Sequence, residues 1–229
     1  ADLPRHADDA EHGLVVVGFP IGSPAFVSEF ARARAARTEV LCARSADLAP
    51  HLRWTLLRVS ASAHFRHLLR VYAVRDVETG VRAHDGALRT AVASVLAADE
   101  LERSWSAGLG PLGRLPLREA YARLALHLPS RMGGVGALLC EDSADAARYA
   151  SWALVASTCR AIRRPVCVTP GTIETAEVSL RARLGHDPSE WASAYGSARL
   201  QSRLTSALSV RRVGRLLALL ALRERFPPS

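Results

Sequence analysis

The chain has 229 residues, of which 49% are apolar, so it can bury a sizeable core and its composition excludes an intrinsically disordered chain. All thirty basic residues are arginines, and the formal net charge is +8 at pH 7. Arginine makes bidentate contacts to phosphate, so the charge favours a nucleic-acid partner, with acidic proteins or ribonucleoprotein scaffolds as the alternative. A GC-rich genome would also explain the absence of lysine.

Cysteine usage and hydropathy restrict the compartment. Cys42, Cys140, Cys159 and Cys167 form no C-x-x-C pair, which favours buried free thiols in a reducing compartment and an intracellular, nuclear or organellar protein over a secreted one. The longest strongly apolar run, residues 216–222, is far shorter than the roughly 20 residues that cross a bilayer, so we expect no membrane partner. The chain begins without Met or a signal-peptide pattern and is expected to be an excerpt of a longer product or a processed chain.

The first predicted elements are a flexible lead-in over residues 1–12 and one short strand. Residues 13–18 read GLVVVG, a β-branched run between glycines that predicts a strand. Pro20 and Gly22 are expected to turn the chain directly after it. A lone strand leaves its backbone groups unpaired, so we expect this one to pair with a sheet from another segment or chain.

Three helical patterns follow, up to residue 72. The first begins at Pro24, where the missing N–H costs nothing, and is expected to turn Phe26, Phe30 and residues 40–41 to one side. The second opens near residues 47–50, with apolar residues at the spacing of one helix face. These are Leu48, Leu52, Leu56 and Val59. The third predicts an amphipathic helix from a similar stripe, made of Phe65, Leu68, Leu69 and Tyr72.

Arginines occupy the positions opposite these apolar stripes. Burial of the stripes would turn the arginines toward solvent, where they could meet a phosphate backbone. The expected nucleic-acid-binding residues are Arg32, Arg34, Arg37, Arg66 and Arg70. His64 and His67 share the outer face of the third pattern, but no neighbouring Cys, Asp or His completes a tetrahedral zinc site, and we expect no metal there.

The rest of the chain predicts further helices separated by turns. Gly80 and Gly86 weaken the helical pattern over residues 76–98, and residues 108–113, GLGPLG, predict a loop. The remaining expected helices are residues 117–125, 143–162, 173–184, 187–194 and 197–225, the last with an interruption considered near residues 210–214. The predicted fold is mostly α, with one short N-terminal β element. We divide it into residues 1–23, a first helical domain over 24–107 and a second helical region over 108–229.

Three sequence blocks occur in a fixed order. They are GFPIGSPAFV at residues 18–27, LPSRMGGVG at 128–136 and AARYASW at 146–152, followed by RLQSRLTSAL at 199–208. In order and spacing they resemble the region after the catalytic palm motifs in reverse transcriptases of non-LTR retrotransposons. There, G-x-P-I-G-x-x-x-F-V leads into a helical thumb, and L-P-x-R-x-G-G-L-G precedes an Ala-rich helix. The resemblance covers nearly the whole chain.

The resemblance implies a helical thumb-like bundle that grips a template–primer duplex. It places Gly18, Pro20, Ile21 and Gly22 in a turn beside the primer terminus. The implied partners are RNA or an RNA–DNA duplex, together with an upstream palm segment or other protein chains. The glycines of the second block have a simpler interpretation as a loop that ends a helix, since glycine tolerates positive φ.

The catalytic part of such a polymerase is not evident. Two-metal chemistry needs carboxylates that hold Mg²⁺, expected only in a complete parent polymerase. Residues 7–9, ADD, superficially match the catalytic turn of such polymerases. They lack a preceding aromatic residue and flanking apolar strands, and Asp9 lies only nine positions before Gly18. Asp85 beside His84 is expected on a solvated helix face, and no other enzyme motif is present. We expect no catalytic residues, metal or cofactor in this chain, and no activity of the chain alone.

Two functions remain open at this point. One is a nucleic-acid-binding fragment of a retrotransposon-type RNA-directed DNA polymerase. The alternative is a non-enzymatic protein of the same descent, retained as an RNA-binding or scaffold subunit of a ribonucleoprotein such as an organellar ribosome. A sequence-specific helix-turn-helix DNA binder is a third and less well supported hypothesis, because no recognition helix stands out between short turns.

Overall fold

The computed structural model describes residues 13–95, 128, 136, 139–162, 170–195 and 197–225. Within them the fold is mostly α with one short N-terminal β element, which confirms the predicted fold class. The helices are α1 (Pro24–Arg44), α2 (Pro50–Val59), α3 (Glu78–Val95), α6 (Cys140–Ala161), α7 (Pro170–Leu184), α8 (Pro188–Tyr195) and α9 (Ser197–Arg225). The predicted lead-in, the loop at 108–113, the helix at 117–125 and the boundary between residues 107 and 108 lie outside the described residues.

The N-terminal strand is paired within the chain, contrary to expectation. Strand β1 (Gly13–Val16) runs antiparallel to β2 (Phe19–Gly22), with Val16 opposite Phe19. The turn lies at Val17 and Gly18, whose φ angles of 50° and 83° are those of a two-residue hairpin turn. Pro20 and Gly22 were expected to form the turn and instead belong to β2, where a proline is tolerated because the strand is at an edge.

Helix α1 packs on α3 through small residues. Its buried face consists of Val27, Ala31, Ala35, Thr38 and Cys42. The expected face is right only in part. Phe30 and Leu41 pack against the buried cores, but Val40 is 50% exposed and the Phe26 ring lies against Gly13 of the hairpin. On α3, a Cβ atom added to Gly80 would come within 2.8 Å of the Ala31 backbone, so the two helix backbones approach closely.

The segment after α2 is compact but is not the expected helix. It consists of the 3-10 turns η1 (Ala61–Ala63), η2 (Leu68–Arg70) and η3 (Val74–Asp76). Its apolar stripe is nevertheless buried, since Phe65, Leu68 and Leu69 have no exposed surface. The stripe expected on α2 is wrong, because three of its members are more than 40% exposed. These are Leu48, Leu52 and Val59.

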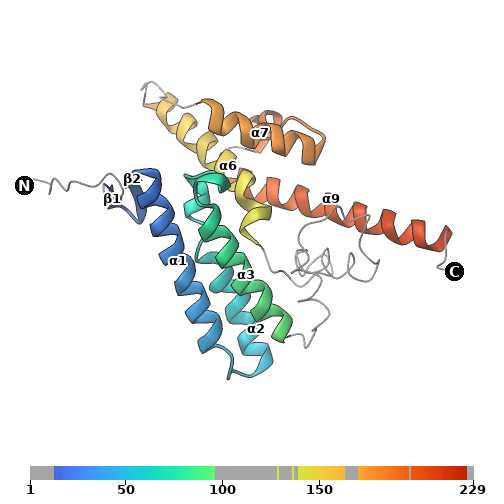
Figure 1. Cartoon of the computed structure of the whole chain (residues 1–229). Helices are drawn as coiled ribbons and strands as arrows, with labels where there is room; N and C mark the ends of the chain where they lie inside the picture. The colour runs from blue at the N-terminus through green and yellow to red at the C-terminus, as the bar shows by residue number, and fades with distance from the viewer. Residues whose placement is uncertain are drawn as a thin grey trace, which may run out of the picture.

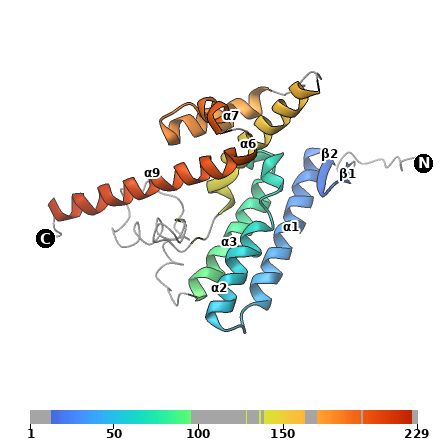
Figure 2. The ribbon, with the colours of Figure 1, turned by 180° about the vertical axis from the view of Figure 1, so that it is seen from behind.

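Helix α6 joins two cores. Ala144 and Ala147 pack into the core formed with α1 and the 3-10 turns, whereas Ala146, Tyr149 and Ala150 pack against α7 and α9. Figures 1 and 2 show the bundle of α1, α2 and α3 meeting the group of α6, α7 and α9 at one end. Alanine keeps both faces of α6 close to their neighbours. Helix α9 runs without interruption past residues 210–214, and the leucines of its first half face the second core.

Among the described residues, the helices are all too short or too polar to traverse a bilayer.

Two glycines of α3 give a matched test of the α1–α3 contact. Gly80→Ala should lower the free energy of unfolding by about 1–3 kcal/mol, because its Cβ would meet the Ala31 backbone. Gly86→Ala should raise it by about 0.5–1 kcal/mol, because nothing lies within 4 Å of the added Cβ and alanine is the better helix former. Urea denaturation of both variants measures the difference. Equal effects would show that α1 and α3 are not in close contact.

Candidate nucleic-acid interface

The three arginines predicted on α1 do not form one group. Arg34 and Arg37 are three residues apart and therefore neighbours on the helix surface, whereas Arg32 is only two residues from Arg34 and faces elsewhere. Arg32 donates to Glu29 over 2.7 Å in an ion pair whose side chains are both 67% exposed. Such a pair contributes little to stability, and it engages the Arg32 guanidinium.

We call residues 60–77, which contain the three 3-10 turns between α2 and α3, the turn segment. Two of its histidines lie beside Arg34 and Arg37. His67 hydrogen-bonds to the backbone of Gly18, and its ring centroid is 5.6 Å from that of Phe19. The charges of Arg34 and Arg37 both reach His64. The hairpin turn, α1 and the turn segment therefore converge on one surface. We call Arg34, Arg37, His64, His67 and the turn residue Gly18 the basic face.

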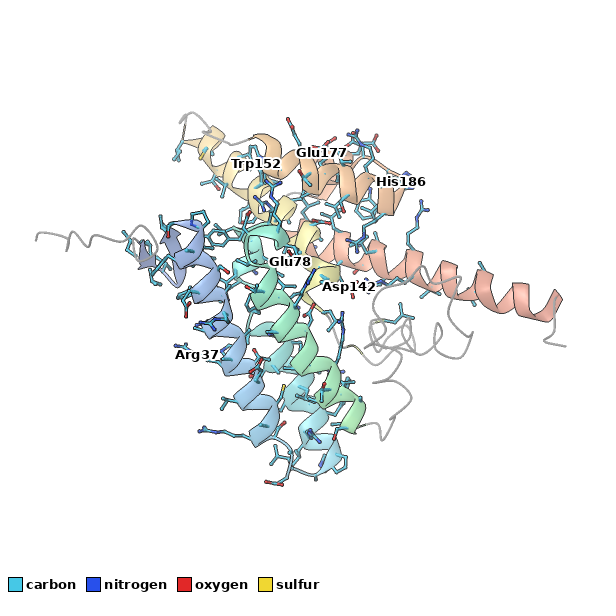
Figure 3. The ribbon with its side chains drawn as sticks, viewed as in Figure 1. Arg37, Glu78, Asp142, Trp152, Glu177 and His186 are labelled. Carbon is cyan, nitrogen blue, oxygen red and sulfur yellow. The ribbon has the colours of Figure 1, made fainter. Side chains whose placement is uncertain are left out.

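Within the described residues, no ion pair compensates the positive charge of the basic face. Burial, followed by the charges of Arg34 and Arg37, lowers the pKa of His64 below its usual 6.5, and burial and Arg34 do the same to the pKa of His67. Arg34 is half-buried, and its Nε has no hydrogen-bond partner among the residues that the structure describes. In the described part of the chain neither Arg34 nor Arg37 forms an ion pair, and Figure 3 shows Arg37 on the outer side of α1.

The remaining predicted arginines differ from each other. Arg70 is exposed, as expected. Arg66 was expected to face solvent, but its side chain is half-buried and donates from Nε to the Ser62 carbonyl over 2.8 Å and from Nη2 to the Ser62 Oγ over 2.9 Å. The reason is the 3-10 geometry, which directs Arg66 back along the chain. Arg66 therefore supports the turn segment.

The hairpin is anchored to the turn segment through Pro20. Pro20 is buried, and its carbonyl accepts a hydrogen bond from the Tyr72 hydroxyl. Ile21 next to it is 53% exposed. The anchor fixes where the hairpin lies relative to the turn segment, and it leaves Gly18 and Ile21 accessible on the outer edge.

A second group of titratable residues is buried beneath the basic face. His84, Asp85 and Cys140 have no exposed surface, and their potential ligand atoms lie within 4.8 Å of one another. The expectation of a solvated helix face for His84 and Asp85 was wrong. Sequence spacing gave no signal of it, because Cys140 is 55 residues further along the chain.

Each residue of this buried cluster has a structural contact, although within the described residues His84 Nε2 has no hydrogen-bond partner. The Asp85 carboxylate accepts from the backbone N–H of Cys140 over 2.9 Å and from that of Glu141 over 3.2 Å, so it caps α6. His84 Nδ1 lies 2.9 Å from the Thr38 hydroxyl of α1. Burial, followed by Asp85, raises the pKa of the Cys140 thiol, which keeps it protonated. These contacts explain the cluster as a junction between α1, α3 and α6.

Comparisons of the sequence with models of known protein families and with curated proteins, and of the structure with solved structures, found no match. The geometry of the basic face and the chemistry of its residues are therefore the basis of the functional argument.

The buried cluster predicts a pH dependence of stability with two opposing parts. Burial lowers the pKa of His84 from 6.5 to about 4, so the unfolded state takes up this proton first and stability falls as the pH decreases below 6.5. Burial raises the pKa of Asp85 from 3.8 to about 7, so the folded state takes up that proton first and stability rises as the pH decreases below 7. In the wild type the two effects offset each other.

Single variants should separate these two effects. Relative to the wild type, His84→Gln should gain about 2 kcal/mol of unfolding free energy between about pH 7 and pH 5, and Asp85→Asn should lose a similar amount. Chemical denaturation at several pH values measures both slopes. Parallel slopes in all three proteins would show that neither group has a shifted pKa.

Proposed function

We propose that this chain binds the sugar–phosphate backbone of RNA or an RNA–DNA duplex, with little sequence preference, through the basic face. The observation that carries the proposal is the convergence of Arg34, Arg37, His64 and His67 beside the hairpin turn, with no ion pair of either arginine in the described residues. A cationic surface whose arginines make no ion pair with the described residues gains most from an external polyanion.

The chemistry of these residues fits phosphate better than bases. Two adjacent guanidinium groups can each donate bidentate hydrogen bonds to phosphate oxygens, which are the same at every nucleotide. The net charge of +8 adds a long-range attraction that does not depend on sequence. The neutral imidazole of His64 can add one hydrogen bond, whereas His67 already bonds to the Gly18 backbone. A nearby phosphate would favour the protonated form of both histidines.

The resemblance to retrotransposon reverse transcriptases supports a more specific role. It puts the hairpin, whose turn residue Gly18 bonds to His67, beside a primer terminus, and α1 along the template–primer duplex. We therefore propose that the chain grips the template–primer of such a polymerase, with the catalytic carboxylates supplied by another segment. Asp85 is not placed to hold a Mg²⁺ that a bound primer shares, because it has no exposed surface and both of its oxygens accept hydrogen bonds from the α6 backbone.

The test compares two double variants that lose the same charge. Arg34→Gln/Arg37→Gln should weaken binding to all RNA sequences alike and reduce the slope of log affinity against log salt by about one to two units. Arg32→Gln/Arg82→Gln is the control, because each of these arginines already pairs with a carboxylate of its own helix. Fluorescence anisotropy with several RNA oligonucleotides over a salt series gives both quantities. Equal losses in the two variants would contradict a localised interface.

Binding should also depend on pH through the two histidines. A bound phosphate stabilises the imidazolium form and raises the pKa of His64 and His67 from their lowered values, so the complex binds more protons than the free protein. Affinity for RNA should therefore increase as the pH falls below about 6.5. His64→Gln/His67→Gln should remove most of this increase. A pH profile unchanged in that variant would place the phosphate elsewhere.

A further inference from the structure

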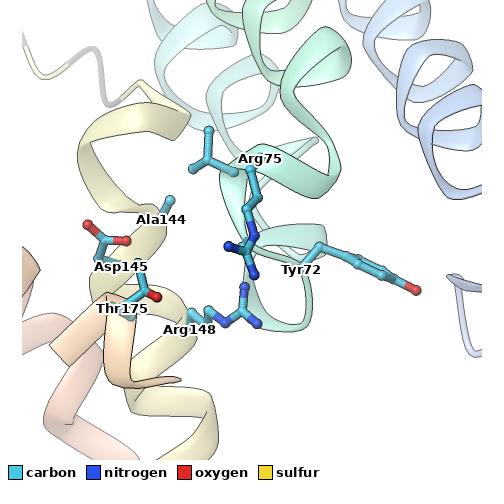
Figure 4. Close-up of a pocket in the computed structure, with 9 residues that line it drawn as sticks. Tyr72, Arg75, Ala144, Asp145, Arg148 and Thr175 are labelled. Atoms are coloured by element: carbon cyan, nitrogen blue, oxygen red, sulfur yellow. The ribbon is translucent and has the colours of Figure 1, made fainter. Parts of the chain in front are cut away.

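A small cavity lies between the turn segment and helices α6 and α7, apart from the basic face. Its volume is about 140 Å³, and it is lined by Tyr72, Ala73, Val74 and Arg75 of the turn segment and by residues of the two helices, among them Asp145, Arg148 and Thr175. Figure 4 shows the guanidinium groups of Arg75 and Arg148 directed toward one another across it. Two like charges that converge on a cavity repel each other unless an anion lies between them.

Arg148 is the unusual member of this site. Arg148 is only 7% exposed, and in the described structure its Nε and Nη1 atoms are buried without a hydrogen-bond partner. Buried guanidinium groups are normally paired, because each unsatisfied donor costs about 1–3 kcal/mol or more. Burial lowers the pKa of Arg148, and the charge of Arg75 adds to this shift, while the charges of Asp76 and Asp145 oppose it.

The two nearby carboxylates are engaged with other groups. Asp145 accepts from the Ser179 hydroxyl over 2.5 Å and from Arg183 Nη1 over 3.4 Å. Asp76 accepts from the backbone N–H of Ala73 over 3.0 Å and lies 3.6 Å from Arg75 Nε. Both carboxylates act on Arg148 only at longer range. They reduce the positive potential of the site without occupying the donors of Arg148.

We propose that this cavity binds a phosphate group, held by Arg148 on the α6 side and by Arg75 on the turn side. Each guanidinium offers parallel N–H donors that match two oxygens of a tetrahedral oxyanion. A cavity volume of about 140 Å³ gives room for a single phosphate group. It is below the roughly 300 Å³ at which sites for larger organic ligands begin, so a whole nucleotide would have to leave its base outside.

The phosphate group has two possible sources, free inorganic phosphate or a phosphodiester of a bound nucleic acid. The proposal does not depend on RNA binding by the basic face, because Arg34, Arg37, His64 and His67 do not line the cavity. The two sources differ in one measurable respect. Only a phosphodiester in the cavity would make nucleic-acid affinity sensitive to Arg75 and Arg148.

The first experiment follows thermal unfolding with inorganic phosphate against sodium chloride at constant ionic strength. Phosphate should raise the Tm of the wild type, and isothermal titration should show a phosphate affinity that falls at least about tenfold in Arg148→Gln and in Arg75→Gln. Arg82→Gln is the charge-matched control and should keep the wild-type response, because Arg82 is exposed and pairs with Glu78. Arg75 is 68% exposed, so its variant retains the fold even if the Arg148 variant does not.

The possible outcomes distinguish failure of the proposal from the two sources of the phosphate group. No phosphate binding by the wild type, or an equal affinity in Arg75→Gln and the wild type, would overturn the proposal. If phosphate binds and Arg75→Gln also weakens RNA binding, the cavity receives a backbone phosphate. If phosphate binds and RNA affinity is unchanged, the cavity is a site for the free anion. Failure of RNA binding in the basic-face variants alone would leave this result unaffected.

Discussion

The buried carboxylate of Asp85 is the interaction on which the arrangement of the two cores depends. It comes from the middle of α3 and accepts the first two backbone N–H groups of α6, across a sequence separation of 55 and 56 residues. The N-terminal end of a helix carries partial positive charge, so a carboxylate in this position offsets both the unpaired donors and the dipole. Because α6 contributes to both cores, this one contact sets the position of α7 and α9 relative to α1 and α3.

The neighbouring contacts explain why this junction requires these residue types. Gly80 lies less than two turns before Asp85 on α3, and its missing side chain lets α1 approach closely enough for the Thr38 hydroxyl to reach His84. A charged imidazole in this place would be costly, and burial keeps the ring neutral by lowering its pKa to about 4. Small residues on α1 and α6 and the buried polar residues His84 and Asp85 on α3 together allow the helices to pack closely.

The sequence was a good guide where hydrophobic spacing was strong and a poor one where small residues formed the contact. The apolar residues Phe65, Leu68 and Leu69 are buried as expected, and α1, α3, α6, α7 and α9 occur where helices were predicted. The buried face of α1 was missed because its alanines carry little hydropathy signal, although they are what permits close approach. His84 and Asp85 were missed because their partners, Thr38 and Cys140, are distant in sequence. Arg66 was placed in solvent because a regular helix was assumed where the chain makes 3-10 turns.

Tyr72 connects the two proposed anion-binding regions. Its hydroxyl donates to the Pro20 carbonyl and so anchors the hairpin, while its backbone neighbours carry Arg75 into the cavity that also contains Arg148. The same turn segment carries His64 and His67 to the basic face. On a continuous helix, residues three or four apart lie on the same face. A chain that alternates 3-10 turns with other turns can direct side chains that are close in sequence to different faces of the molecule. The departure from helix between residues 60 and 77 is therefore what allows one short segment to supply cationic groups to two separate surfaces.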